Sequence, residues 1–203
     1  MTIRPALPER RSAREPSGEN VTGSCDSVRL FLFHHAGGSR LIFHGWDERF
    51  PAGWEVHAPD APGRGRKHDV PAADNDVELV DHFLTELSPL LDRPFAFFGH
   101  SMGALVAYEL ARRLRDEAGP QPVWLGLSAC GSPRPSGAGG PRSTSSDEEL
   151  RNWLLSAGGT SGEVARHPLT WRMIGPLLRR DLRVIETWRP DVDAPPLDAA
   201  LSV

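Results

Sequence analysis

The feature that most constrains this chain is a Gly-x-Ser-x-Gly motif at residues 99–103, with Ser101 at its centre. A short apolar run at residues 95–98 precedes it and is typical of a buried strand in a parallel sheet. Apolar residues at helical spacing follow, from Leu105 to Leu114. A serine at such a corner has a strained backbone, and flanking glycines remove the Cβ atoms that would clash there. The motif predicts that the Ser101 hydroxyl lies at the carboxyl edge of the sheet. The alternative is a tight turn with an incidental serine.

Strand-like and helical segments alternate along the chain. Expected strands cover residues 28–33, 54–58, 95–98, 122–128 and 199–203. Expected helices begin near residue 39, at capping boxes at residues 75–78 and 146–149, after Ser101, and near residue 170. This alternation predicts an α/β fold with a mainly parallel sheet and helices on both faces. Ligands of such sheets bind at the carboxyl ends of the strands, where Ser101 and the loops at 35–38 and 62–66 fall.

Two of the expected helices are defined by particular apolar residues. The helix near Ser39 is expected to carry the apolar residues Leu41, Ile42 and Trp46. The helix after the first capping box is expected to pack one apolar face on the sheet. The residues that define that face are Val77, Val80, Leu84, Leu87 and Leu91.

Composition excludes several classes of protein. The 203 residues are enough for one domain, and the net charge of −4 argues against a nucleic-acid surface. No segment approaches the roughly 20 apolar residues of a membrane span, and no secretory h-region follows the N-terminus. Cys25 and Cys130 lie far apart and form no metal-ligand spacing. A reduced, cytoplasmic protein is therefore expected.

The chain divides into a tail and one domain. Residues 1–26 are rich in Pro, Arg, Glu and Ser and are expected to form a flexible tail. Residues 27–203 are expected to form the domain. Within it, residues 131–146 are rich in Gly, Pro and Ser, and helical patterns follow them. The segment at about 131–189 suits a helical lid over an active site, and the alternative is two ordinary packing helices.

Further signatures, in a fixed order, accompany the serine motif. They are LFLFHHAGG at residues 30–38, PGRGR at 62–66, FGHSMGA at 98–104 and LRRDL at 178–182. In these signatures the sequence resembles the type II thioesterases of the α/β-hydrolase fold, which accompany nonribosomal peptide and polyketide synthases. The resemblance covers about residues 28–203. One departure is His34, where the family usually has proline.

The resemblance implies an activity and a set of site residues. The family hydrolyses acyl thioesters on the phosphopantetheine arm of acyl or peptidyl carrier proteins, as editing enzymes of secondary-metabolite biosynthesis. Ser101 would be the nucleophile, and the backbone N–H groups of Met102 and of Ala36, or alternatively of Gly37, would form the oxyanion hole. The resemblance implies no metal and no bound cofactor. A monomer that meets a carrier protein is expected.

A serine hydroxyl is a poor nucleophile unless a base takes its proton. In this fold the order along the chain is serine, acid, histidine. The family places the acid after the strand that here begins near residue 199, and the histidine one strand later. Because the sequence ends at Val203, we expect both to be absent and the domain to be incomplete. His35 is the candidate for a substitute base, because it lies in the expected oxyanion loop and could approach Ser101. His100 is next to the serine, but in the family the residue at this position of the motif is not the base.

Two functions remain as alternatives to a thioesterase whose base is supplied elsewhere. The first is an inactive homologue that binds a carrier protein or acyl group without turnover. The second is an α/β hydrolase that acts on oxygen esters. The HAGG and PGRG segments at residues 35–38 and 62–65 argue against that possibility.

Overall fold

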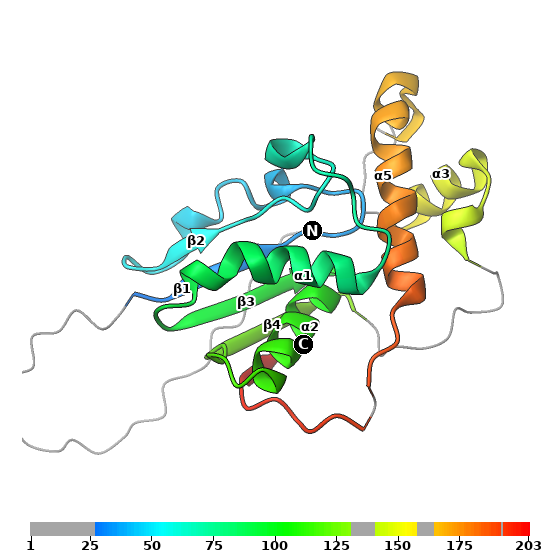
Figure 1. Cartoon of the computed structure of the whole chain (residues 1–203). Coiled ribbons are helices and arrows are strands. Elements are labelled where there is room, and N and C mark those ends of the chain that lie inside the picture. The colour runs from blue at the N-terminus through cyan, green and yellow to red at the C-terminus, as the bar shows by residue number, and fades with distance from the viewer. Residues whose placement is uncertain (1–26, 131–140, 158–164, 192) are drawn as a thin grey trace, which may run out of the picture.

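The computed structural model describes residues 27–130, 141–157, 165–191 and 193–203 (Figure 1). The tail expected at residues 1–26 and most of the Gly-rich connection lie outside the described residues. The described part of the expected lid contains the helices η5 (Arg142–Thr144), α3 (Asp147–Ser156) and α5 (Pro168–Thr187).

A five-stranded parallel sheet forms the centre of the domain, in the strand order β2-β1-β3-β4-β5. The strands are β1 (Arg29–Phe33), β2 (Glu55–His57), β3 (Phe95–His100), β4 (Trp124–Ser128) and β5 (Ala200–Ser202). Phe33 of β1 pairs with Gly99 of β3, and Gly99 pairs with Leu127 of β4. The three central strands therefore end at one edge, as the alternating sequence pattern predicts.

The two helices for which the sequence predicted a capping box begin where that signal places them. The α-helices are α1 (Asp76–Leu87), α2 (Met102–Asp116), α3 (Asp147–Ser156) and α5 (Pro168–Thr187). The 3₁₀ helices are η1 (Arg40–Phe43), η2 (Asp47–Arg49), η3 (Gly65–Lys67), η4 (Ser88–Leu90) and η5 (Arg142–Thr144). The Asn75 side chain accepts a hydrogen bond from the Glu78 N–H, and Ser146 and Glu149 form a reciprocal capping box.

Helices cover both faces of the sheet, as expected. Alternate residues of β1 and β3 point to opposite faces. Phe31, Phe33 and Phe97 pack with the apolar sides of α1 and α2 on one face. Leu30 and Leu32 pack on the other face with the aromatic residues of the segment that contains η1 and η2, namely Phe43, Trp46 and Phe50. The central strands β1 and β3 are thus largely buried on both sides.

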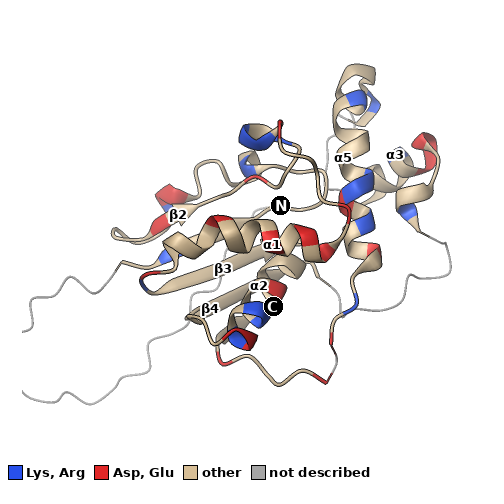
Figure 2. Ribbon diagram, in the orientation of Figure 1, with Lys and Arg blue, Asp and Glu red and all other residues tan. Residues whose placement is uncertain are grey.

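Helix α5 lies beyond the carboxyl ends of the strands (Figure 1). Its inner side forms a second apolar cluster with α3 that includes Leu150, Trp171 and Leu178. Its carboxyl end is joined to α2 because the Trp188 indole donates to Glu109 at 2.8 Å. Figure 2 shows basic residues along α5 and acidic residues at the start of α3. Within the described ranges, no helix combines the length and hydropathy that a membrane crossing needs.

Two of the expected helices are present but differ from the prediction in part of their residues. The helix expected near Ser39 is a 3₁₀ helix of four residues, and Phe43 is its buried residue while Leu41 is exposed. The chain turns away within one turn, where Gly45 has a left-handed φ of 74°. In α1, Val77 is 54% exposed. Its buried side chains are Leu79, Val80, Phe83 and Leu87.

We predict that Phe97→Ala destabilises the domain by about 3–5 kcal/mol, because it leaves a cavity in the centre of the core. Phe97 has no exposed surface and contacts aromatic rings of β1. Urea unfolding monitored by circular dichroism measures the loss. The control is Val77→Ala on exposed α1 surface, for which we expect a change within about 0.5 kcal/mol. Equal losses for the two variants would contradict the description of the core.

Candidate active site

Ser101 occupies a strained turn between the last residue of β3 and the first residue of α2. Its φ is 56° and its ψ is −112°, a combination that costs a non-glycine residue of order 1–3 kcal/mol. The Ser101 N–H donates to the Ser128 carbonyl at 2.8 Å, and the Ser101 carbonyl accepts from the Ala104 N–H at 3.0 Å. These bonds hold the strained residue in place. The predicted strand–turn–helix geometry is confirmed.

The two glycines of the motif are required by close backbone contacts. A Cβ atom on Gly99 would lie 1.9 Å from the Gly103 carbonyl oxygen. A Cβ atom on Gly103 would lie 2.0 Å from the Phe33 carbonyl oxygen and 2.9 Å from that of His34. Neither site has room for a side chain. The first turn of α2 therefore packs directly against the chain where it leaves β1.

The loop at residues 34–38 follows β1 and lies beside the serine turn. The His35 and His100 rings are 6.0 Å apart, edge to face. The Gly37 N–H donates to Asp181 Oδ2 of α5 at 2.7 Å, and the Leu178 side chain packs against Gly37. Of the two amides that the sequence left open for an oxyanion hole, the Gly37 N–H is thus already engaged. This favours Ala36, whose role stays a prediction.

A buried ion pair connects this loop to two distant segments. Arg64 donates to both carboxylate oxygens of Asp181, at 2.5 and 2.6 Å, and to the Gly38 carbonyl at 3.2 Å. Both charged side chains are only 5% exposed. One guanidinium therefore joins the loop after β1, the PGRGR loop and helix α5. Sequence reasoning named both segments as signatures but missed the pair. One signal in the sequence could have indicated the pair: the acidic residue Asp181 lies on the apolar face of the helix that includes Leu178, where an unpaired charge is not expected.

His34 is a second buried polar residue of the loop. Its Nε2 accepts from the Ala61 N–H at 3.2 Å, and its Nδ1 lies 2.9 Å from the His35 carbonyl oxygen. A neutral ring with its proton on Nδ1 satisfies both contacts. Burial, followed by the positive charge of Arg64, lowers the pKa of His34 to about 4. The residue that departs from the family pattern is therefore a neutral link between the ends of β1 and β2.

No histidine of the described residues forms a hydrogen bond with the Ser101 hydroxyl. The His100 Nδ1 pairs with the Ser128 hydroxyl at 3.0 Å, and burial lowers the pKa of His100. The His35 Nδ1 lies 2.9 Å from the Ala36 carbonyl oxygen. The use of His35 as a substitute base therefore stays a prediction. In the part of the chain that the structure describes, no group of three or more His, Cys, Asp or Glu side chains could hold a metal ion.

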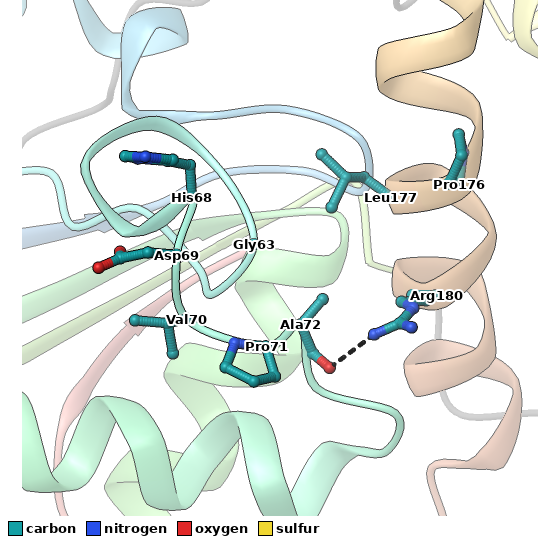
Figure 3. Close-up of a pocket in the computed structure, with 9 residues that line it drawn as sticks. All are labelled: Gly63, His68, Asp69, Val70, Pro71, Ala72, Pro176, Leu177 and Arg180. Carbon is teal, nitrogen blue, oxygen red and sulfur yellow. Dashed lines mark hydrogen bonds between the residues drawn. The ribbon is translucent and has the colours of Figure 1, made fainter.

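A pocket of about 330 Å³ lies between α5 and the loop that precedes α1 (Figure 3). Its lining residues are Gly63, His68, Asp69, Val70, Pro71, Ala72, Pro176, Leu177 and Arg180. The Arg180 guanidinium donates to the Ala72 carbonyl at 3.1 Å across one side of it. None of the lining residues belongs to the serine turn or to the loop at 34–38. The pocket is thus a feature separate from the serine.

The fold and the serine turn define an α/β protein of the hydrolase type, with a serine at the carboxyl edge of a parallel sheet. The sequence profile of the family described as "Thioesterase domain" matches residues 28–203. The chain therefore belongs to the thioesterase domain family.

Relatives and solved structures agree with this assignment. The chain is 35% identical to the gramicidin S biosynthesis protein GrsT of Aneurinibacillus migulanus, over 85% of this chain and 67% of GrsT. It is 39% identical to a probable cadicidin biosynthesis thioesterase of Streptomyces griseus, over 80% of this chain and 45% of that protein. The chain thus spans about half to two thirds of the length of these relatives.

The fold is shared with thioesterases of biosynthetic pathways. RedJ, a thioesterase from prodiginine biosynthesis in Streptomyces coelicolor, has a TM-score of 0.77 and 34% identity, over 86% of this chain and 68% of RedJ. BorB, a type II thioesterase from the borrelidin biosynthetic cluster, has a TM-score of 0.75 and 33% identity, over 87% of this chain and 71% of BorB. The resemblance to type II thioesterases is confirmed.

We predict that Asp181→Ala destabilises the domain by about 3–5 kcal/mol, because it leaves the buried Arg64 charge unpaired. The double variant Arg64→Met/Asp181→Leu should recover part of this loss, since no charge is then buried. The control is Asp147→Ala, which breaks the exposed pair with Arg179 and should cost at most about 1 kcal/mol. Urea unfolding of the four proteins measures these changes. A loss for Asp181→Ala no larger than that of the control would contradict the role of the pair.

We also predict that acid weakens the domain through His34. The folded-state pKa lies at about 4, below the ordinary value of about 6.5, so the unfolded chain binds more protons between these values. Stability is therefore lost as the pH falls through this range, by about 2 kcal/mol between pH 7 and pH 5. The variant His34→Gln keeps an acceptor but does not titrate. Its loss of stability between pH 7 and pH 5 should therefore be smaller than that of the wild type by about 2 kcal/mol. Unfolding curves at the two pH values test this, and equal losses would contradict it.

Proposed function

We propose that this chain is the serine-bearing part of an editing thioesterase that hydrolyses acyl thioesters on the phosphopantetheine arm of a carrier protein. The observation that carries the proposal is the strained Ser101 turn at the sheet edge, beside the loop at residues 34–38. Membership of the thioesterase domain family supports it. The relatives' names point the same way, because they belong to gramicidin S, prodiginine and borrelidin biosynthesis.

In the proposed reaction, Ser101 Oγ attacks the carbonyl carbon of the thioester. The C–S bond then breaks, the phosphopantetheine thiol leaves with a proton, and the acyl group stays on the serine. Water attacks this acyl-serine in the second step, which releases the carboxylic acid and restores the hydroxyl. The strained φ of Ser101 suits this role because it keeps the hydroxyl clear of the helix that follows.

Backbone amides would stabilise the oxyanion of each tetrahedral intermediate. Met102 is the first residue of α2, so its N–H has no acceptor within the helix and lies at the positive end of the helix dipole. The Ala36 N–H would be the second donor. The neighbouring Gly37 N–H is held by Asp181, which would fix the loop before a substrate binds. Each such donor contributes on the order of 10²–10³ in turnover.

The first step requires a base that removes the proton of the Ser101 hydroxyl. Loss of the base in a serine hydrolase costs on the order of a million-fold in turnover. The family places its acid and histidine after β5, and His35 is the substitute within this sequence. The second candidate function, binding of a carrier protein without turnover, rests on the lack of a hydrogen bond between Ser101 and any described histidine.

We predict that hydrolysis of an acetyl carrier protein needs Ser101 and rises strongly when the chain is extended through the family's acid and histidine. The assay compares residues 1–203 with the extended form, by the release of free phosphopantetheine thiol. Ser101→Ala in the extended form should lower the rate by at least about 10³-fold. Ser88→Ala, on the exposed η4 helix, is the control and should leave the rate unchanged. An extended form that is no faster, or that keeps its rate without Ser101, would refute the proposed function.

A further inference from the structure

Helix α5 has two apolar faces, which is unusual for a helix at a protein surface. Its inner face is buried in the cluster with α3 and includes Trp171, Leu178 and Leu182. On the other side, Leu169 is 64% exposed and Met173 is 74% exposed. Nothing in the fold of the described residues explains why large apolar side chains occupy these positions.

The exposed side chains share one face with the helical residues that line the pocket. Positions i, i+4, i+7, i+8 and i+11 of an α-helix lie on the same side. We call this set the outer face of α5, and its members are Leu169, Met173, Pro176, Leu177 and Arg180. The last three line the pocket of about 330 Å³ (Figure 3). An exposed apolar stripe therefore runs along α5 into a cavity.

Helix α5 contributes an excess of positive charge beside the outer face, and the one acidic residue that lines the pocket is Asp69, from the loop opposite α5. Helix α5 contains four arginines and two acidic residues, Asp181 and Glu186. Asp181 is paired with Arg64, and Glu186 accepts hydrogen bonds from Ser143 at η5. Both carboxylates are thus engaged, whereas Arg172 and Arg180 are exposed. The blue bands along α5 in Figure 2 show this excess of positive charge.

We propose that the outer face of α5 docks an acidic amphipathic helix of the carrier protein that brings the thioester, and this rests on the proposed function. The stripe from Leu169 to Arg180 is roughly 16 Å long, about three helical turns, which matches a short helix laid along it. An apolar side chain of that helix enters the pocket. Its carboxylates pair with Arg172 and Arg180. Charge complementarity selects this occupant over an uncharged one.

The position of the outer face fits delivery of a substrate to Ser101. The same helix contacts Gly37 through both Asp181 and Leu178. A partner bound on one side of α5 is therefore one helix diameter from the loop beside the serine, on the order of 10–12 Å. Only a long, extended arm such as the phosphopantetheine of the proposed substrate, and not a short side chain of the partner, would span that distance.

The test is a binding titration of residues 1–203 with a phosphopantetheinylated peptidyl carrier protein. Met173→Glu places a negative charge in the stripe and should weaken binding at least tenfold. Arg172→Glu/Arg180→Glu should weaken it similarly and should reduce its dependence on salt. The control is Val77→Glu, which adds the same charge to an exposed apolar position of α1 and should leave the affinity unchanged. Equal melting temperatures show that the variants fold.

The outcomes separate this proposal from the proposed function. If the wild type binds the carrier and Met173→Glu binds equally well, the docking face is wrong. If the wild type does not bind, the docking proposal also fails, and hydrolysis of a small acyl-pantetheine thioester by the extended form decides the function independently. Concentration-dependent self-association that Met173→Glu abolishes would show that the face binds a second copy of this chain, which likewise overturns the proposal.

Discussion

The geometry of the site depends on one close backbone contact, between the first turn of α2 and the end of β1. Because Gly103 has no side chain, the helix approaches the Phe33 carbonyl more closely than any other residue would allow. That contact brings the loop after β1 beside Ser101. The unusual φ of the serine follows from the same constraint, since the chain must reverse from β3 into α2 within one residue. Strain at Ser101 is tolerated because backbone hydrogen bonds with Ser128 and Ala104 hold the residue, and because β1 and β3 beside it are largely buried.

The Arg64–Asp181 pair extends this arrangement to the periphery of the domain. A buried ion pair is seldom a net source of stability, because both charges lose their hydration. Its effect here is to fix the positions of three segments relative to one another. The Asp181 carboxylate also accepts from the Gly37 N–H, and the Arg64 guanidinium also donates to the Gly38 carbonyl. Helix α5 is thereby placed relative to the loop beside the serine. The same helix presents its second apolar face to solvent, so the buried pair sets the position of both surfaces.

Local patterns allowed much of the fold to be predicted from the sequence. The alternation of strands and helices, the capping residues Asn75 and Ser146 and the serine turn depend on residues close together in the chain, and each is found in the structure. The Arg64–Asp181 pair joins residues 117 positions apart, and no local pattern states which distant charge will be its partner. The face of α1 was misassigned at Val77 because periodicity gives the spacing of an apolar face but not its boundary. A helix was expected near Ser39, but its 3₁₀ type and its short extent, Arg40–Phe43, were not, because short apolar segments fit several structures equally well.

The central claim is that the Ser101 hydroxyl is the reactive group of the domain. Labelling with a fluorophosphonate probe, followed by mass spectrometry of the peptides, tests it most directly, because the probe phosphonylates an activated serine without requiring a particular acyl group. The measurement uses the chain extended through the acid and histidine of the family. The account predicts a single adduct on Ser101. An adduct on any other residue, or no adduct at all on a folded protein, would contradict it.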